Sequence, residues 1–441
     1  GKEDEQVLEE SIEALKNDTR YKTDNIRYLD NLGPARFAKI WQGIFLCKKE
    51  FNIKIMNTTT YLASKPRYEI LDGLRGVAAM IVVAYHLFET YSAGPVHQIL
   101  NHGYLAVDFF FVLSGFVIGY AYDDRWDRMS IKDFFKRRLV RLHPMVIMGT
   151  LIGAVFFYLG DCSAFPLIME TPWWKVLLMV LLGCLMIPTP VSWDIRGWWE
   201  VNSLNGPTWS LMWEYIANIL YALFIRHFSK IALGIFVALA ALLTIDIAFN
   251  IDTFGLLATR EAAAYTFIGG WSLTPDQLYI GISRLLYPFF VGLLLSRVNK
   301  LIKIKRGFYW CSLLIAAILV MPRIGGTEAM WMNGAYEAFC VLIMFPLIVA
   351  MGAGSNVTGK RSVAICQFLG EISYPLYITH FPLIYMQIAW ARNHPDAPLG
   401  MHVLLAVSIF ILSIAIAYAC LKLYDEPVRE WLKRRFLMKK R

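Results

Sequence analysis

The sequence has little charge for its length of 441 residues. Only 17% of its side chains are charged, 57% are hydrophobic, and the mean hydropathy is +0.47. A typical soluble domain carries about a quarter charged residues, so this composition excludes an ordinary soluble protein and a disordered chain. Cysteine is also scarce: the seven cysteines are scattered singly with no CxxC spacing, which excludes a disulfide scaffold.

Several catalytic signatures are missing as well. The sequence has no HExxH, no GxSxG, no P-loop and no Cys/His metal spacing, so it predicts no metal site. Its basic segments are interrupted by apolar blocks, which argues against a nucleic-acid-binding surface.

What the sequence does have is long apolar blocks. Many of them approach roughly 20 residues, the length that a helix needs to cross a hydrocarbon core of about 30 Å. Continuous apolar blocks are unlike the alternating pattern of a barrel strand. The sequence therefore predicts an all-α polytopic membrane helix bundle. Eleven candidate blocks lie at about 70–90, 103–122, 143–160, 173–190, 209–227, 231–250, 276–296, 307–322, 332–351, 364–390 and 402–423.

The segments between the blocks differ in charge. Basic segments face the cytoplasm by the positive-inside rule. The strongly basic segments are 125–141, 296–306 and 429–441, and the segments with more acidic than basic residues are 191–208, 251–276 and 323–337. This pattern predicts that both termini are cytoplasmic.

Two cytoplasmic termini require an even number of crossings, so we expect about ten transmembrane helices from the eleven blocks. Either 143–160 or 173–190 should fail to cross as a full helix. The weaker candidate is 173–190, because Thr171-Pro172-Trp173-Trp174 precedes it and Pro188-Thr189-Pro190 ends it. Such flanks are typical of an interfacial or re-entrant element.

Three parts are expected along the chain. Residues 1–64 form a charged extramembrane extension, predicted to be cytoplasmic, in which the first 55 residues carry ten basic and ten acidic side chains. Residues 65–430 form the membrane domain. Residues 431–441 form a basic cytoplasmic tail.

Ionisable residues inside the first span are candidate functional residues, because such residues are costly in a membrane. Arg75 and His86 are eleven residues apart, close to three helical turns, so they share a face and are separated by roughly 16 Å along the axis. A neutral histidine suits a general base, and an arginine suits phosphate binding. The alternative is a packing histidine with a solvated interfacial arginine.

Two further carboxylates enter apolar blocks. Asp108 lies in an aromatic-rich run, and the hairpin of the first two spans could bring it near His86. Glu214 lies about one turn inside the fifth block. Either carboxylate could orient His86 and stabilise the imidazolium; the alternatives are a helix-start carboxylate for Asp108 and a structural ion pair for Glu214.

A basic segment in the 125–141 loop contains Arg137, Arg138 and Arg141. It is either a topology determinant attracted to anionic lipid or an anchor for the phosphates of a cytosolic cosubstrate.

Six stretches in order resemble the acyltransferase family 3 of integral membrane acyltransferases. They are LDGLRGVAAMIVVAYH, GYLAVDFFFVLSGF, RRLVRLHP, GPTWSLMWEY, FLGEISYPLYITH and YDEPVRE, between about 68 and 430. The resemblance covers most of the chain. Relatives that modify polysaccharides often carry a fused SGNH domain after the last span, and the expectation here is a standalone member.

The resemblance implies an acyl-CoA-dependent O-acyltransferase. It assigns the essential histidine to His86 and the paired arginine to Arg75, and it implies that Arg137, Arg138 and Arg141 bind the phosphates of acetyl-CoA or another acyl-CoA. Asp108 and Glu214 are expected beside the catalytic His86, and the expected substrate-binding residues are Trp209, Ser210, Tyr377 and His380. For the aromatic residues, an interfacial belt is the alternative.

The implied reaction transfers an acetyl group to a hydroxyl of a cell-envelope carbohydrate or lipid-linked acceptor, in the bacterial inner membrane and with membrane lipids as neighbours. A proton- or anion-coupled transporter or flippase is the second hypothesis, with His86, Asp108, Glu214 and Arg75 as a relay. A membrane-bound regulatory protein is the third. The sequence leaves open the acceptor, the acyl chain and whether the chain forms a homo-oligomer.

Overall fold

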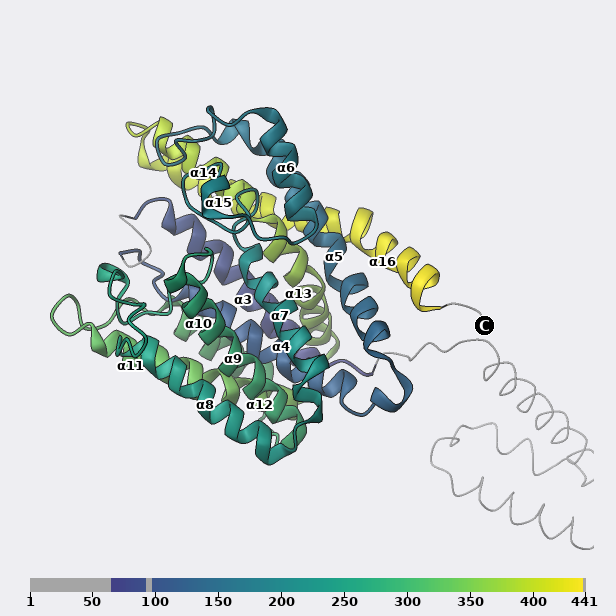
Figure 1. Ribbon diagram of the computed structural model, residues 1–441. Coiled ribbons are helices and arrows are strands. Elements are labelled where there is room, and N and C mark those ends of the chain that lie inside the picture. Colours follow the sequence, from purple (N-terminus) through teal and green to yellow (C-terminus); the bar gives the residue numbers. More distant parts are fainter. Residues whose placement is uncertain (1–64, 93–96, 439–441) are drawn as a thin grey trace, which may run out of the picture. The chain divides into compact units, whose positions relative to one another are not determined.

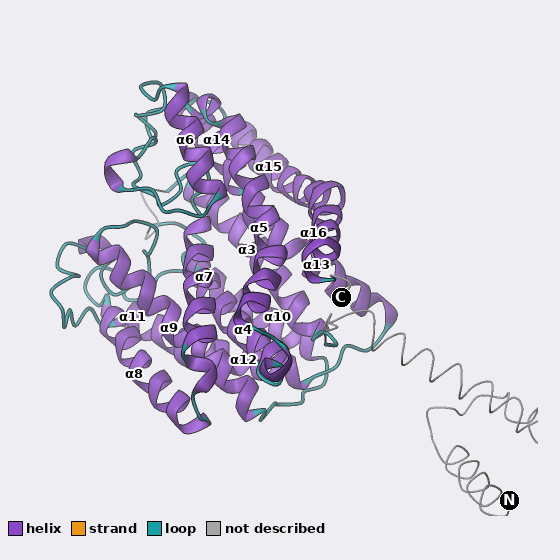
Figure 2. Cartoon of the chain, turned by 45° about the vertical axis from the view of Figure 1, so that its right-hand side comes forward, coloured by secondary structure: helices purple, strands orange, loops and turns teal. Residues whose placement is uncertain are grey.

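The computed structural model describes residues 65–92 and 97–438. The predicted extension at 1–64 lies outside these residues, as do 439–441. Within the described ranges the chain is built of helices and contains no strand, as Figure 2 shows. This confirms the predicted all-α class. The α-helices are α3 (Glu69–Glu89), α4 (Ala106–Tyr122), α5 (Ile131–Phe156), α6 (Trp173–Cys184), α7 (Thr208–Leu223), α8 (Lys230–Ala248), α9 (Pro275–Val298), α10 (Gly307–Val320), α11 (Trp331–Phe339), α12 (Phe345–Gly354), α13 (Lys360–Thr379), α14 (Phe381–Asn393), α15 (Leu399–Cys420) and α16 (Glu426–Leu432).

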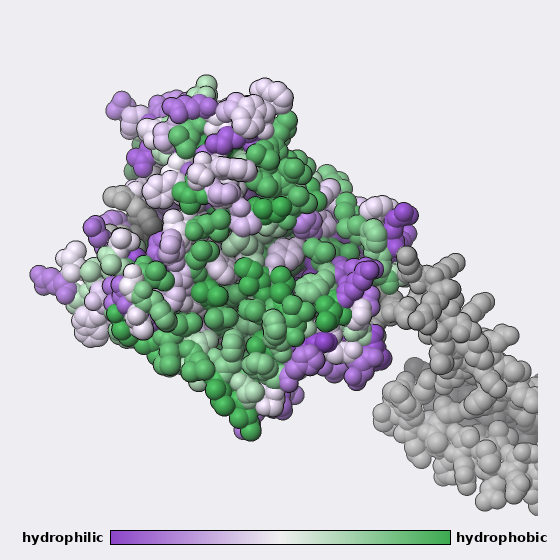
Figure 3. Space-filling model, viewed as in Figure 1, coloured by the Kyte–Doolittle hydropathy of each residue, from purple (hydrophilic) through white to green (hydrophobic). Residues whose placement is uncertain are grey.

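Seven helical stretches of the described residues are long and apolar enough to cross a membrane, two of them formed by helices joined through a π-turn. These stretches support the prediction of a polytopic membrane protein. The expected number of ten transmembrane helices is not confirmed. The helices in three of the predicted blocks are too short or too polar to count as membrane-crossing; they are α7, α10 and the pair α13–α14. Apolar side chains cover most of the bundle surface seen in Figure 3, as lipid contact requires.

The helix α6 fits the prediction that 173–190 is not a full crossing. It has 12 residues, which is about 18 Å of helix. At its start, Lys175 Nζ donates to the carbonyl of Asp194 at 3.2 Å, and after its end Thr189 N donates to the carbonyl of Val201 at 2.8 Å. The segment after α6 therefore runs back to the start of α6 at Asp194 and then comes beside the end of α6 again at Val201, whereas α5 is a helix of 26 residues.

The centre of the bundle is formed by two tightly packed helix pairs, α3 with α13 and α4 with α9. In Figure 1, α3, α4 and α9 occupy the middle of the bundle, while α6, α14 and α15 lie together near its upper end. This arrangement places the polar C-terminal end of α3 next to α14 and the loops that flank α6.

Small residues let α4 and α9 approach closely. A Cβ atom built on Gly115 would lie 1.8 Å from the carbonyl oxygen of Phe289, and one on Gly292 would lie 2.0 Å from that of Val112. Glycine is thus required by backbone contact at both positions, as in other membrane helix pairs with small residues at the interface.

We expect Gly115→Ala to lower the melting temperature of the detergent-solubilised protein by several degrees, because the new methyl group has to push apart two backbones. Gly234→Ala in α8 is the matched control, since nothing lies within 4 Å of its Cβ position. The control should melt at the same temperature or higher, because alanine is the better helix former. Equal melting temperatures for the two variants would contradict the close α4–α9 contact.

Candidate active site

His86 lies in the last turn of α3 and forms an ion-pair contact with a carboxylate that the sequence analysis did not single out. Its Nδ1 is 2.7 Å from Oε2 of Glu89, three residues later. Residues at this spacing lie on one face of a helix. An ionised Glu89 accepts a hydrogen bond from Nδ1–H, which fixes the tautomer and leaves the Nε2 lone pair available as a base.

Aromatic rings enclose the histidine. The ring centroid of Phe381 is 4.8 Å from that of His86, and the centroid of Tyr85 is 4.9 Å away. The His380 ring is 5.5 Å away. His86 nevertheless keeps 19% of its side chain exposed, and it opens onto a cavity.

The cavity has a volume of about 550 Å³, which is within the ordinary range of small-ligand sites. Besides His86 and Glu89, its wall contains three charged side chains, Glu200, Arg284 and Arg392. Aromatic residues form much of the remaining wall: Tyr85, Tyr104, Trp198, Trp209, Trp271, Tyr377 and Phe381. The arrangement suits a ligand that offers both apolar faces and a few polar atoms.

Neither Asp108 nor Glu214 touches His86, so the expected partner of the histidine was wrong. Asp108 is fully buried and pairs with Arg284 on α9, with 2.6 Å between Oδ2 and Nη2. Glu214 accepts from Arg138 Nη2 and from Ser114 Oγ, each at 2.6 Å. Both carboxylates have nearer cationic partners, which compensate for their loss of solvation.

The arginines of the predicted cluster have different surroundings in the structure. Arg138 is buried in its pair with Glu214, and Arg75 donates to Asp72 Oδ1 at 2.7 Å and to Ser373 Oγ at 3.0 Å. Arg141 is exposed, has no ion pair with a described residue, and lies within electrostatic range of Arg75 and Arg138. Arg137 is half-buried.

Two of the four predicted substrate-binding residues line the cavity. They are Trp209, at the start of α7, and Tyr377, on α13. Ser210 lies behind Tyr377, with 2.7 Å between the two hydroxyl oxygens. His380 is fully buried, and its Nδ1 lies 3.1 and 3.0 Å from the carbonyl oxygens of Leu376 and Tyr377. His380 therefore supports the wall and does not form part of it.

Sequence analysis missed four charged residues of the cavity, Glu89, Glu200, Arg284 and Arg392. Arg392 lies in the last turn of α14, just beyond the predicted block 364–390. Glu89 had a usable signal, because its i,i+3 spacing from His86 places both on one face. Arg284 also had one, since it is an ionisable residue inside the block 276–296. Glu200 had none, because only the path of the loop after α6 carries it to the cavity.

No group of three or more His, Cys, Asp or Glu side chains among the described residues has the geometry of a metal site.

The chain is similar to known acyltransferases over most of its length. A family model described as "Acyltransferase domain" matches residues 68–422. The acyltransferase MdmB of Streptomyces mycarofaciens is 24% identical over 79% of this chain and 88% of its own length. The peptidoglycan O-acetyltransferase OatA of Listeria monocytogenes is 23% identical over 74% of this chain and 50% of its own.

A shorter match has higher identity. Protein 2 in the picA locus of Rhizobium radiobacter is 31% identical over 35% of this chain and 81% of its own length. No solved structure matches.

Proposed function

Since this chain belongs to the acyltransferase family 3, whose domain covers residues 68–422, we propose that it transfers an acyl group, in the simplest case acetyl, from acyl-CoA to a hydroxyl of a cell-envelope carbohydrate or lipid-linked acceptor. The single observation that carries the proposal is the His86–Glu89 pair, 2.7 Å apart, at the wall of a cavity of about 550 Å³. A carboxylate-oriented imidazole beside a ligand cavity is the arrangement that general-base catalysis needs.

In the proposed reaction, His86 Nε2 takes the proton of the acceptor hydroxyl as its oxygen attacks the thioester carbonyl. The new C–O bond forms, the C–S bond breaks, and CoA leaves with the proton that His86 has carried. Glu89 stabilises the imidazolium between these steps, because its negatively charged carboxylate accepts a hydrogen bond from Nδ1–H.

The donor end of the site is proposed at the opposite end of α3 from His86. Arg75 lies there, roughly 16 Å from His86 along the helix axis, and Arg141 is nearby. Arg141 is the arginine best suited to a CoA phosphate, because it is exposed and has no carboxylate partner among the described residues. The positive-inside rule places this end in the cytoplasm, where acyl-CoA is available.

The acceptor is proposed to enter the cavity from the far side of the membrane. The Listeria relative is a peptidoglycan O-acetyltransferase, which favours an envelope carbohydrate. The membrane concerned is then the bacterial cytoplasmic membrane, with both termini in the cytoplasm.

The donor half of the proposal is tested with Arg141→Ala. We expect the dissociation constant for acetyl-CoA to rise by roughly tenfold, since one charge-assisted contact to phosphate is worth about 1.5 kcal/mol or more. Arg361→Ala is the control, because Arg361 is also an exposed arginine, in the first turn of α13. The measurement is equilibrium binding of radiolabelled acetyl-CoA to the purified protein.

Two results would count against this assignment. If both variants weaken acetyl-CoA binding equally, binding depends only on the general positive charge of this face. No weakening by Arg141→Ala would move the phosphate site elsewhere.

A further inference from the structure

Glu200 is a buried carboxyl group at the wall of the cavity. It lies in the segment between α6 and α7 and is 7% exposed. Its side chain forms no ion pair with a described residue. A carboxyl group in such a place has to be neutral or hydrogen-bonded.

Only one oxygen of this carboxyl group has a partner. Tyr385 on α14 donates its hydroxyl proton to Oε2 at 2.5 Å, and the same hydroxyl accepts from Gly206 N at 3.2 Å. Oε1 forms no hydrogen bond with the described residues. It also keeps some exposed surface, because it is not one of the fully buried polar atoms that lack a hydrogen-bond partner. Oε1 lies beside Gly206, 2.2 Å from where a Cβ atom on that glycine would be, and both residues line the cavity. Oε1 is therefore the oxygen left for a ligand.

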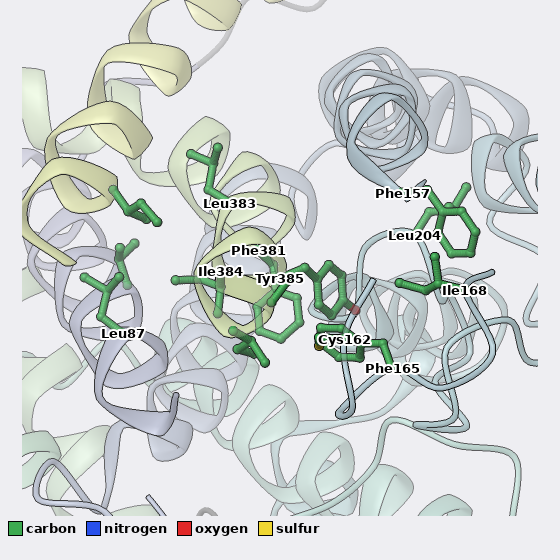
Figure 4. Packing of buried hydrophobic residues seen from close by; sticks show 14 of the residues in the cluster. Leu87, Phe157, Cys162, Phe165, Ile168, Leu204, Phe381, Leu383, Ile384 and Tyr385 are labelled. Carbon is green, nitrogen blue, oxygen red and sulfur yellow. The ribbon is translucent and has the colours of Figure 1, made fainter. Parts of the chain in front are cut away.

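Glu200 is connected to the catalytic pair through the cavity wall. The Phe381 ring contacts His86 on one side and Tyr385 on the other, with centroid separations of 4.8 and 4.7 Å. Figure 4 shows Phe381 and Tyr385 close together, with the Tyr385 ring extending toward Phe165. A molecule that reaches His86 in this cavity can therefore also meet Glu200.

The segment that carries Glu200 is held firmly by Asp194. The carboxylate of Asp194 accepts from four backbone amides and from Ser203 Oγ, at 2.7 to 3.1 Å. Arg196 is buried and stacks on Tyr385, with its guanidinium carbon 3.7 Å from the ring centroid. The Glu200–Tyr385 contact is thus supported from both sides and is formed before any ligand arrives.

Burial favours the neutral form of Glu200. Burial is the largest cause that raises the pKa of Glu200, and the Asp194 and Glu89 carboxylates add to it; against the opposing Tyr385 hydrogen bond and the Arg196 charge, the net pKa is about 8. Because Oε2 accepts from Tyr385, the proton of the neutral group lies on Oε1, at the cavity.

We infer that Glu200 binds the acyl acceptor, donating a hydrogen bond from Oε1 to an uncharged oxygen of the acceptor next to the hydroxyl that His86 activates. This rests on the proposed function. Two carboxyl groups in one cavity then have different roles: Glu89 is ionised and orients the base, and Glu200 is neutral and positions the acceptor. Once ionised, Glu200 cannot donate and repels electron-rich oxygens.

The test uses Glu200→Gln and Glu200→Ala with radiolabelled acetyl-CoA and methyl β-glucoside as an uncharged acceptor probe. Glutamine keeps a donor but does not titrate, and alanine removes the donor. Glu170→Gln, an exposed carboxylate in the segment before α6, is the matched control. Melting temperatures verify that each variant is folded.

For the wild type, the KM for the glucoside should rise about tenfold between pH 6.5 and pH 9. The KM of Glu200→Gln should be near the wild-type value at pH 6.5 and should not change between pH 6.5 and pH 9. The KM of Glu200→Ala should be about tenfold higher than the wild-type value at pH 6.5, and equally high at pH 9. The same rise with pH in Glu200→Gln, or equal impairment of the two variants at pH 6.5, would overturn the inference. So would release of labelled acetate by the wild type without any transfer to the glucoside.

Failure of the proposed function looks different. In that case the wild type consumes no acetyl-CoA at all, with or without the glucoside.

Discussion

Replacing Glu89 by glutamine is expected to lower the turnover number for acyl transfer by about 10² to 10⁴, with little change in the affinity for acetyl-CoA. The carboxylate is 2.7 Å from Nδ1 of His86 and keeps the proton there. A glutamine amide can donate to Nδ1 instead, which moves the imidazole proton to Nε2 and removes the lone pair that acts as the base. The same exchange in the Ser-His-Asp triad costs about 10⁴ in kcat for this reason.

The measurement is single-turnover transfer from radiolabelled acetyl-CoA by the purified protein. Glu371→Gln is the control, because Glu371 is an exposed carboxylate on α13 that pairs with Lys422 at 3.3 Å. Glu89→Asp should recover part of the activity, since it keeps the charge. Wild-type turnover in Glu89→Gln would show that Glu89 does not set the tautomer of His86.

The second large effect is expected at the buried Asp108–Arg284 pair. Arg284 donates to Asp108, to the carbonyl of Gly269 at 3.0 Å and to that of Tyr104 at 2.8 Å, so it joins α9 to α4 and to two segments at the cavity. Both side chains of the pair are 1% exposed. Removing either partner leaves an uncompensated buried charge, which costs about 3 to 5 kcal/mol.

We therefore expect Arg284→Met and Asp108→Leu each to lower the melting temperature strongly, and the double variant to be more stable than either. The measurement is thermal unfolding followed by a thiol-reactive dye, which reports the exposure of the buried cysteines Cys162, Cys311, Cys340 and Cys366. Lys422→Met is the control: it removes exposed ion pairs and should lower the free energy of unfolding by less than about 1 kcal/mol. Additive losses in the double variant would mean that the two residues are not coupled.

The helix class and the short helix at 173–190 could be predicted from the sequence because apolar block length and flanking prolines are local properties. The 12-residue α6 follows from the Pro-Trp-Trp start and the Pro-Thr-Pro end of its block. The extent of α10 could not be predicted, because a block of apolar residues does not fix where its helix ends, and the helix has 14 residues.

At the site, the sequence indicates which residues are costly in a membrane but not which of them pair. Asp108 was expected beside His86 because they lie on adjacent helices, yet its partner Arg284 comes from 176 residues further along the chain. The position of Glu200 depends on a loop that is organised by Asp194 and closed against Tyr385. Such long-range contacts leave no periodic signal in the sequence.

The central claim is that His86 is the general base for acyl transfer from acyl-CoA, and the most direct measurement compares wild type with His86→Ala in the consumption of radiolabelled acetyl-CoA. We expect the wild type to release labelled acetate slowly when no acceptor is added, and His86→Ala to bind acetyl-CoA with wild-type affinity but to turn it over at least 10³-fold more slowly. Equal rates for the two proteins, or no reaction of acetyl-CoA with either, would contradict the account.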